Sequence, residues 1–265
     1  MPSYAEVVAE LRAAGCVFAE DEAVLLVEAG GDLEALVRRR VAGEPLEQLL
    51  GWADFGGLRI HVDPDVFVPR RRTEELARRT ADLALPGDIV VDLCCGTGAI
   101  AAFVRASVPG VDVHAVDVLP EAVACARKNL GDQVYEGDLF SALPETLRGE
   151  IALVVANPPH VPSDEIVLMP TEARDHEPRR ALDGGGDGLD CVRAILSEVA
   201  DWLRPAGSLL LEVGAAQGTV AVEACLARGL ESVSFADADS GTTVVVATAQ
   251  PGQDPDGSSD RLSTS

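Results

Sequence analysis

The sequence has little positive charge. Its 265 residues include 21 Lys and Arg against 44 Asp and Glu, which gives a formal net charge of -23. Proteins that follow a nucleic-acid backbone need clustered cations at the phosphates, so this balance argues against nucleic acid as a direct substrate. The charge carries little information on the fold, because net charge acts on solubility and encounter.

Long apolar runs are also missing. No stretch approaches the roughly 20 apolar residues that a membrane-spanning helix needs. The N-terminal segment contains Glu6 and Glu10 and no long apolar run, which does not fit a secretory signal peptide. We therefore expect a cytoplasmic protein with no membrane partner.

The six cysteines lack the spacing of a metal site. None forms a Cys-x-x-Cys pair, and none stands at zinc-ligand spacing from a histidine. Free thiols with apolar neighbours fit a reducing cytosol. Cys94 and Cys95 are adjacent at a predicted strand end with no His beside them, so packing is favoured over a nucleophilic or redox role. No metal is predicted.

The N-terminal part of the chain is predicted to form a small unit. At about 150 residues per domain, the length allows one large domain or a large domain with a small one. Apolar residues at helical spacing predict short helices between residues 3 and 43. Two β-like runs flank Gly56-Gly57, which predicts a hairpin. We assign residues 1–80 to a small helical domain with a hairpin linker.

The pattern changes at about residue 87 to alternating strands and helices. Apolar strands separated by helices predict an α/β fold with a parallel sheet covered on both faces over 81–249. Ligands in such folds bind at the carboxyl ends of the strands. Residues 250–265 are rich in Ser, Asp and Gly and are predicted to be disordered. The expected strands are 89–93, 111–116, 133–135, 151–156, 208–213, 232–235 and 242–247, and the expected helices are 97–106, 120–130, 189–203 and 215–228.

The first two strand ends carry groups that suit a nucleotide-like ligand. The first strand contains Asp92 and leads to Gly96-Thr97-Gly98, where glycines allow close backbone approach and the next helix offers free N–H groups. A dinucleotide site, a mononucleotide site and a tight turn all fit this motif. The second strand ends at Asp117, about 20 residues beyond Gly98, where an acidic residue suits ribose hydroxyls. Capping of the next helix is the alternative.

The third strand is followed by Asp138-Leu139-Phe140. A carboxylate there can accept from an exocyclic amino group while the apolar pair flanks a purine. The alternative is a polar turn followed by two core residues.

The fourth strand ends in Asn157-Pro158-Pro159-His160, the most informative motif. Prolines donate no N–H and have a restricted φ, so the carbonyls and the Asn157 carboxamide oxygen can converge on a planar –NH2 group. Such a nitrogen is a poor nucleophile, and two acceptors orient it and support its developing charge. His160 supplies a flat ring for stacking, and a role as base is the less favoured alternative. A simple turn is the less favoured alternative for the whole motif. We assign Asn157, Pro158 and His160 to catalysis and the whole motif to substrate binding.

Together the strand ends resemble those of class I S-adenosylmethionine-dependent methyltransferases. Asn-Pro-Pro narrows the resemblance to enzymes that methylate planar nitrogens. The flanking motifs resemble those of the bacterial release-factor glutamine methyltransferases (HemK-like), over about residues 43–247. They are Gly43-Glu44-Pro45-Leu46, Phe55-Gly56-Gly57-Leu58, Val68-Pro69-Arg70-x-x-Thr73-Glu74, His176-Glu177-Pro178, Asp187-Gly188-Leu189 and Leu211-Glu212-Val213-Gly214-x-x-Gln217.

The resemblance implies a Rossmann-like, seven-stranded sheet and N5-methylation of a glutamine amide. In this family the glutamine belongs to the Gly-Gly-Gln motif of peptide chain release factors, and S-adenosylmethionine is the methyl donor. We expect a monomer whose N-terminal domain docks the release factor. By the same resemblance, residues 96–98 line the methionine moiety and Asp117 holds the ribose. Asp138, Leu139 and Phe140 flank the adenine, Asp92 and Asn157 complete the cofactor site, and Asn157 and Pro158 bind the target amide.

Three departures from the family pattern concern the acceptor more than the cofactor. His160 stands where the family has Tyr, and Cys94 stands where it has the first glycine of the loop. The run from Asp239 to Thr243 lacks the family's Arg. Alternative functions are methylation of another planar nitrogen, in a nucleic-acid base or a small molecule, and a degenerate S-adenosylmethionine-binding paralogue.

Arginines at 70, 71, 72, 78 and 79 form a local basic run. A solvated helix face is the favoured interpretation. Contact with an acidic surface, or with ribosomal RNA near a release factor, is the alternative.

Overall fold

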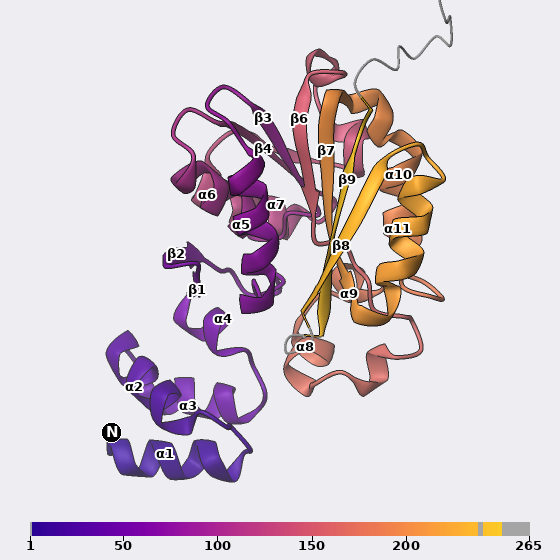
Figure 1. Cartoon of the computed structure of the whole chain (residues 1–265). Coiled ribbons are helices and arrows are strands. Elements are labelled where there is room, and N and C mark those ends of the chain that lie inside the picture. The colour runs from indigo at the N-terminus through magenta and orange to yellow at the C-terminus, as the bar shows by residue number, and fades with distance from the viewer. Residues whose placement is uncertain (1, 238–240, 251–265) are drawn as a thin grey trace, which may run out of the picture.

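The computed structural model describes residues 2–237 and 241–250 (Figure 1). A small helical unit at the N-terminus lies beside a larger α/β body. The predicted disordered tail falls outside the described residues from residue 251 onward, as do Asp239 and Ser240.

Three helices form the N-terminal unit around their own small core. Ser3 caps the first helix, with its hydroxyl on the Glu6 N–H and the Glu6 carboxylate on the Ser3 N–H. Buried Leu11, Leu26 and Val37 pack at the centre of the unit. The helices are α1 (Tyr4–Ala13), α2 (Ala19–Ala29) and α3 (Leu33–Val41).

The predicted hairpin is confirmed. After the short helix α4 (Leu46–Leu50), strands β1 (Trp52–Phe55) and β2 (Leu58–His61) pair antiparallel. Gly56 and Gly57 both have positive φ, at 59° and 82°, which suits a two-residue turn between twisted strands. A Cβ on Gly56 would also lie 2.5 Å from the Phe103 ring, so packing requires glycine there as well.

Seven strands form one sheet in the order β5-β4-β3-β6-β7-β9-β8, as expected for the predicted fold. Neighbours from β5 to β7 are parallel, and β9 is antiparallel to both β7 and β8. The carboxyl ends of the parallel strands therefore meet at one edge. The strands are β3 (Ile89–Leu93), β4 (Asp112–Asp117), β5 (Val134–Glu136), β6 (Ile151–Ala156), β7 (Leu203–Gly214), β8 (Glu231–Asp237) and β9 (Thr242–Thr248).

Helices cover both faces of this sheet. One apolar cluster joins the sheet to α5, α6 and α7, and a second joins the other face to α10 and α11. The boundary predicted after residue 80 falls inside α5, which packs against the sheet. The helices are α5 (Glu74–Leu83), α6 (Ala99–Ser107), α7 (Pro120–Leu130), α8 (Thr171–His176), α9 (Arg179–Leu182), α10 (Asp190–Trp202) and α11 (Gly218–Leu226).

Strand β7 begins earlier than predicted. It starts at Leu203, so Pro205 lies inside the strand and does not merely follow the end of α10. The pairing with β6 is irregular between Ile151 and Leu153, and proline is tolerated where ladder hydrogen bonds are already interrupted. Among the described residues, no helix combines the length and apolar character needed to cross a bilayer.

Candidate active site

A cavity of about 460 Å³ opens at the carboxyl ends of β3, β4 and β6. The other walls include residues from the linker before α5, the segment that follows β5, the segment containing α8 and α9, and the start of α10. The structure brings most of the predicted site residues to this cavity. They are Gly96, Thr97, Asp117, Asp138, Leu139, Asn157, Pro158, Pro159 and His160.

Asp117 connects the ends of β3 and β4. Its Oδ2 accepts from the Gly96 N–H at 2.9 Å, and its Oδ1 accepts from the Leu119 N–H at 2.9 Å. Burial raises the pKa of Asp117, and the N–H donors and Arg180 oppose that rise. Asp117 lines the cavity, as the ribose interpretation requires. The capping alternative is wrong, because the N-cap of α7 is Leu119 and no side chain caps that helix.

Asp92 and Gly98, for which we expected direct cofactor contact, are not among the residues that line the cavity. Asp92 Oδ2 accepts from the Ala101 N–H at 3.2 Å, and its Oδ1 has no hydrogen-bond partner. Burial raises the pKa of Asp92 to about 8. Gly98 is required by helix packing, because an added Cβ would lie 2.6 Å from Leu130 Cδ1.

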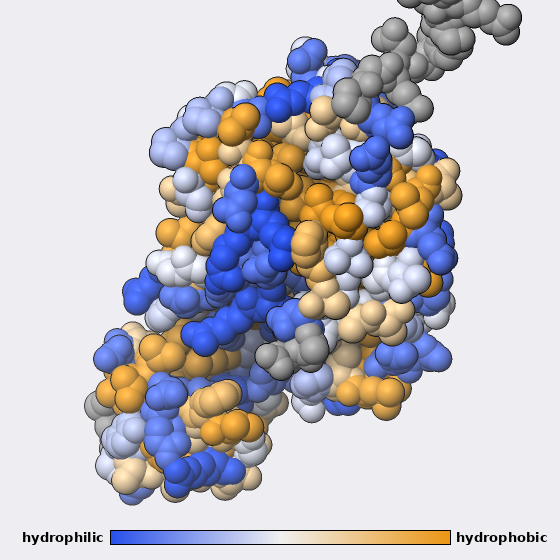
Figure 2. Space-filling view, in the orientation of Figure 1, coloured by the Kyte–Doolittle hydropathy of each residue, from blue (hydrophilic) through white to orange (hydrophobic). Residues whose placement is uncertain are grey.

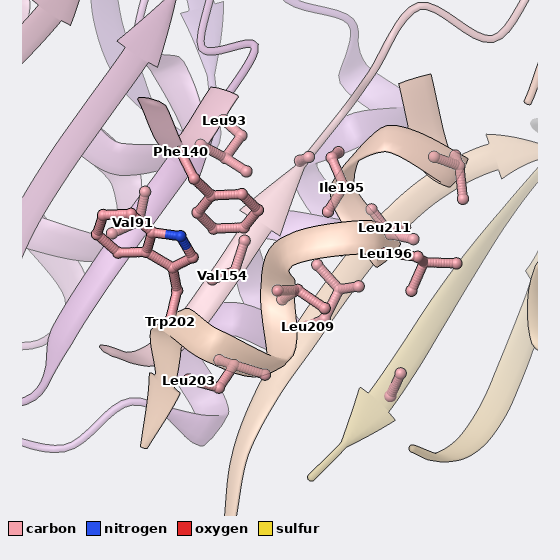
Figure 3. Packing of buried hydrophobic residues seen from close by; sticks show 14 of the residues in the cluster. Val91, Leu93, Phe140, Val154, Ile195, Leu196, Trp202, Leu203, Leu209 and Leu211 are labelled. Atoms are coloured by element: carbon pink, nitrogen blue, oxygen red, sulfur yellow. The ribbon is translucent and has the colours of Figure 1, made fainter. Parts of the chain in front are cut away.

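Phe140 also departs from its expected place beside the adenine. Its ring is fully buried in the core and stacks on Trp202, with ring centroids 5.6 Å apart (Figure 3). Leu139 and Asp138 do line the cavity. Of the two interpretations of Phe140 offered by the sequence, the core residue is the one that the packing supports.

The Asn-Pro-Pro-His motif follows β6 directly. Asn157 Nδ2 donates to Thr73 Oγ1 at 3.3 Å, which leaves the carboxamide oxygen as its acceptor. His160 Nδ1 lies 2.9 Å from the Pro158 carbonyl oxygen. Because a carbonyl only accepts, Nδ1 carries the proton and Nε2 keeps a lone pair. Burial lowers the pKa of His160, so the ring is neutral at pH 7.

Thr73, Arg72 and Glu212 support this motif and were missed as site residues. Glu212 on β7 is fully buried, and Arg72 Nε lies 3.5 Å from its Oε1. Burial raises the pKa of Glu212, while the Thr73 hydroxyl and the Arg72 guanidinium oppose the rise. Arg72 and Thr73 lie in the Val68–Glu74 motif, and Glu212 lies in the Leu211–Gln217 motif. Nothing in the sequence indicated that the two motifs lie beside each other.

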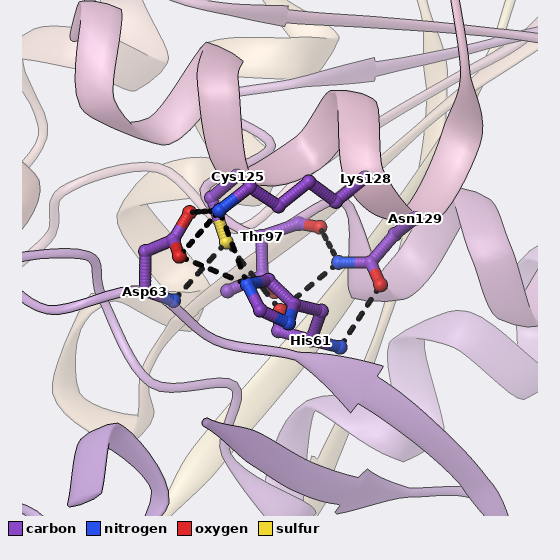
Figure 4. Close-up of polar contacts among 6 residues, drawn as sticks. All are labelled: His61, Asp63, Thr97, Cys125, Lys128 and Asn129. Carbon is purple, nitrogen blue, oxygen red and sulfur yellow. Dashed lines mark hydrogen bonds and ion pairs between the residues drawn. The ribbon is translucent and has the colours of Figure 1, made fainter.

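Asn129 on α7, shown in Figure 4, also contacts the loop that contains Thr97. It was missed because nothing in the sequence of its predicted helix indicated that contact. Its Nδ2 donates to the carbonyls of Thr97 and His61, at 2.9 and 3.0 Å. Its Oδ1 accepts from the His61 N–H at 2.9 Å. Asn129 therefore ties the hairpin to the loop that lines the cavity.

The segment closing the cavity is fixed by buried polar groups. The carboxylate of Glu177 accepts from Arg70 at 2.6 Å and from the Val68 N–H at 3.2 Å. Gln217 donates to the His160 carbonyl at 2.8 Å. Buried Arg40 pairs with Glu22 and with Glu172, each at 2.6 Å, and so joins the N-terminal unit to a cavity-lining residue.

The basic run divides into two parts. Arg78 and Arg79 pair with Glu74 and Glu75 on α5, whose outer face forms a hydrophilic band in Figure 2. Arg70 and Arg72 instead pair with the buried carboxylates described above. In residues 2–237 and 241–250, no cluster of three or more His, Cys, Asp or Glu side chains is arranged to hold a metal ion.

Comparison with known proteins places the chain among methyltransferases. The family model of the methyltransferase small domain matches residues 73–189. A solved methyltransferase from Pyrococcus furiosus shares the fold, with a TM-score of 0.54 at 16% identity, covering 80% of this chain and 97% of that one.

Two curated relatives are similar in sequence over most of the chain. A 4-amino-L-phenylalanine/4-methylamino-L-phenylalanine methyltransferase from Streptomyces pristinaespiralis is 39% identical, covering 68% of this chain and 65% of that protein. The release factor glutamine methyltransferase of Gloeobacter violaceus is 43% identical over 201 residues, covering 72% of this chain and 69% of that protein. The chain belongs to the release factor glutamine methyltransferase family.

Proposed function

We propose that this chain transfers the methyl group of S-adenosylmethionine to the side-chain amide nitrogen of a glutamine in a peptide chain release factor. The observation that carries the proposal is the orientation of the Asn157 side chain after β6. Its amide nitrogen donates to Thr73, so its amide oxygen can accept a hydrogen bond from the target amide. The target glutamine is the one in the Gly-Gly-Gln motif, in line with the activity named for the Gloeobacter relative.

The residues of the cavity fit the cofactor. Asp117 would hold the ribose hydroxyls, Gly96 and Thr97 the methionine part, and Asp138 and Leu139 the adenine. A Cβ on Gly96 would meet no atom closer than 4.0 Å, so the loop leaves open space there. The volume of about 460 Å³ is typical of small-molecule sites. S-adenosylmethionine supplies an electrophilic methyl group on a sulfonium.

The chain's own contribution is to orient a weak nucleophile. The lone pair of an amide nitrogen is delocalised into its carbonyl, so the nitrogen attacks poorly unless it is held in line. Asn157 Oδ1 accepts one N–H of the target and stabilises the positive charge that develops on nitrogen. Thr73 fixes which way the Asn157 carboxamide faces. The neutral His160 ring provides a flat surface for the target amide.

The N-terminal unit would dock the release factor. Its Arg40 is anchored to Glu172 in the cavity wall, so the unit is held in a defined position beside the acceptor side of the site. A protein substrate bound to residues 2–43 would then present a loop to the cavity.

Transfer of a labelled methyl group to purified release factors tests the proposal. The control substrate carries a Gln→Ala change in its Gly-Gly-Gln motif. Label on the wild-type substrate alone is the expected result. No label on either substrate, from protein shown to bind S-adenosylmethionine, would overturn the assignment of the acceptor.

A second candidate function is methylation of a small aromatic amine. Two observations favour it: His160 replaces the family's Tyr and keeps Nε2 as a proton acceptor, and the relative from Streptomyces pristinaespiralis is named for 4-amino-L-phenylalanine. The assay above is repeated with 4-amino-L-phenylalanine as acceptor. Label on this amine and none on release factors would establish the second function in place of the first.

A further inference from the structure

Two cysteines far apart in the sequence meet at the cofactor side of the cavity. Cys94 directly follows β3, and Cys191 lies in the first turn of α10. Their Sγ atoms are 3.7 Å apart, both residues line the cavity, and both thiols are free. The contact joins the loop after β3 to a helix 97 residues further along the chain.

The contact makes the two thiols chemically unequal. The hydrogen bond between the two Sγ atoms lowers the pKa of Cys191, although burial and the carboxylates of Asp138 and Asp117 oppose that shift. The same contact, together with burial, raises the pKa of Cys94. Because the thiolate is the reactive form of cysteine, this difference favours Cys191 as the nucleophile of the pair and Cys94 as its resolving partner.

Movement of Cys94 would be transmitted to the predicted cofactor contacts. Cys94 has a φ of 56°, in the left-handed region that a residue with a side chain rarely adopts. The next residues are fixed to β4, since Cys95 N–H donates to the Val116 carbonyl and Gly96 N–H donates to Asp117. A covalent bond between Cys94 and Cys191 would shorten the Sγ–Sγ separation from 3.7 Å to about 2 Å and so pull this loop toward α10.

We propose that Cys94 and Cys191 are a thiol pair that hydrogen peroxide oxidises to a disulfide, and that the disulfide blocks the cofactor site. The Cys191 thiolate attacks a peroxide oxygen, the O–O bond breaks, and one water leaves, which gives a sulfenic acid. The Cys94 sulfur then displaces the sulfenic oxygen as a second water and forms the S–S bond. Two thiols are oxidised and one peroxide is reduced. The inference rests on the proposed cofactor site and is independent of the acceptor.

The test treats the whole protein with peroxide and then follows two readouts. Peptide mass mapping shows whether a 94–191 cross-link has formed with the loss of two hydrogen atoms, and calorimetry gives the S-adenosylmethionine affinity. We expect the cross-link, at least a tenfold loss of affinity, and recovery of both after dithiothreitol. Cys16→Ser, which removes a distant thiol on the N-terminal unit, should behave like the wild type.

Cys191→Ser and Cys94→Gly separate the bond from other oxidation. Each should form no cross-link and keep the same affinity after peroxide as before it, and Cys94→Gly also removes the strained side chain. The inference is overturned if the wild type forms no 94–191 bond, or if the bond forms and the affinity is unchanged. Failure of the reduced wild type to bind S-adenosylmethionine would instead contradict the proposed function, and this is measured before oxidation.

Discussion

The two sides of the cavity are built differently. On the cofactor side, Asp117 holds the Gly96 loop directly, and both lie at the ends of adjacent strands. On the acceptor side, Asn157 is oriented by Thr73, which is 84 residues away, and the His160 carbonyl by Gln217, 57 residues further along. The Asp117 contact of the proposed cofactor side joins neighbouring strand ends, and contacts from Asn129 and Cys191 add to it. The contacts that orient Asn157 and the His160 carbonyl on the proposed acceptor side come from segments distant in the sequence.

The largest effect should come from removing the Asn157 amide oxygen. Asn157→Ala deletes the oxygen that we propose holds the target nitrogen, so methyl transfer should fall by about 100- to 1,000-fold, the cost of losing one group that stabilises transition-state charge. Cofactor affinity should be unchanged, because the contacts of Asp117 remain. The measurement is kcat with saturating substrate. Near-normal transfer by the variant would show that Asn157 does not accept the hydrogen bond from the target amide.

Asn129→Ala tests whether the hairpin stabilises the cofactor side. It removes the side-chain partner of the Thr97 and His61 carbonyls and of the His61 N–H, so the free energy of unfolding should fall by about 1–3 kcal/mol. S-adenosylmethionine should also bind more weakly. Lys128→Ala is the control, since its exposed pair with Asp63 is worth at most about 1 kcal/mol. Equal effects of both variants, by denaturant unfolding, would contradict this role.

Asp92 should make the stability of the cofactor side depend on pH. Its pKa is raised to about 8 in the folded protein, from 3.8. Between those values the folded state holds a proton that the unfolded state has lost, so this contribution to stability falls as pH rises, by about 1.4 kcal/mol per pH unit at most. Asp92→Asn stays neutral and should show a smaller decline between pH 5 and 8. The measurement is the free energy of unfolding against pH for both proteins. If the two curves ran parallel, Asp92 would not be the group that causes the decline.

The smallest effect should come from the support of Asn157. Thr73→Val removes one hydrogen bond and should lower methyl transfer by up to about tenfold, with cofactor affinity unchanged. Thr73→Ser keeps the hydroxyl and should restore the rate. If valine and serine gave the same rate, Thr73 would have only a packing role.

The comparison also explains what the sequence could predict. Asp117 ends one apolar strand and Asn157 follows another, and parallel strands end at one edge, so their place in the same cavity followed from the strand pattern. Thr73 beside Asn157, Asn129 beside Thr97 and Cys94 beside Cys191 depend on tertiary packing, which no local spacing records.

The expected position of Phe140 beside the adenine was wrong for a different reason. An apolar residue after a strand end has the same sequence pattern whether it faces a ligand or the core. The space between β3, β6 and α10 decided in favour of the core, where Phe140 stacks on Trp202.

The most direct test of the two-sided account compares Asp117→Ala with Asn157→Ala. For each variant, the S-adenosylmethionine Kd and the single-turnover transfer rate at saturating cofactor are measured. The account predicts that Asp117→Ala raises Kd by about 10- to 100-fold, the cost of losing a charge-assisted hydrogen bond, with little change in transfer. Asn157→Ala should leave the Kd nearly unchanged and lower the transfer rate by about 100- to 1,000-fold. If both variants lost affinity and transfer in the same proportion, the cavity would act as a single unit and the account would be wrong.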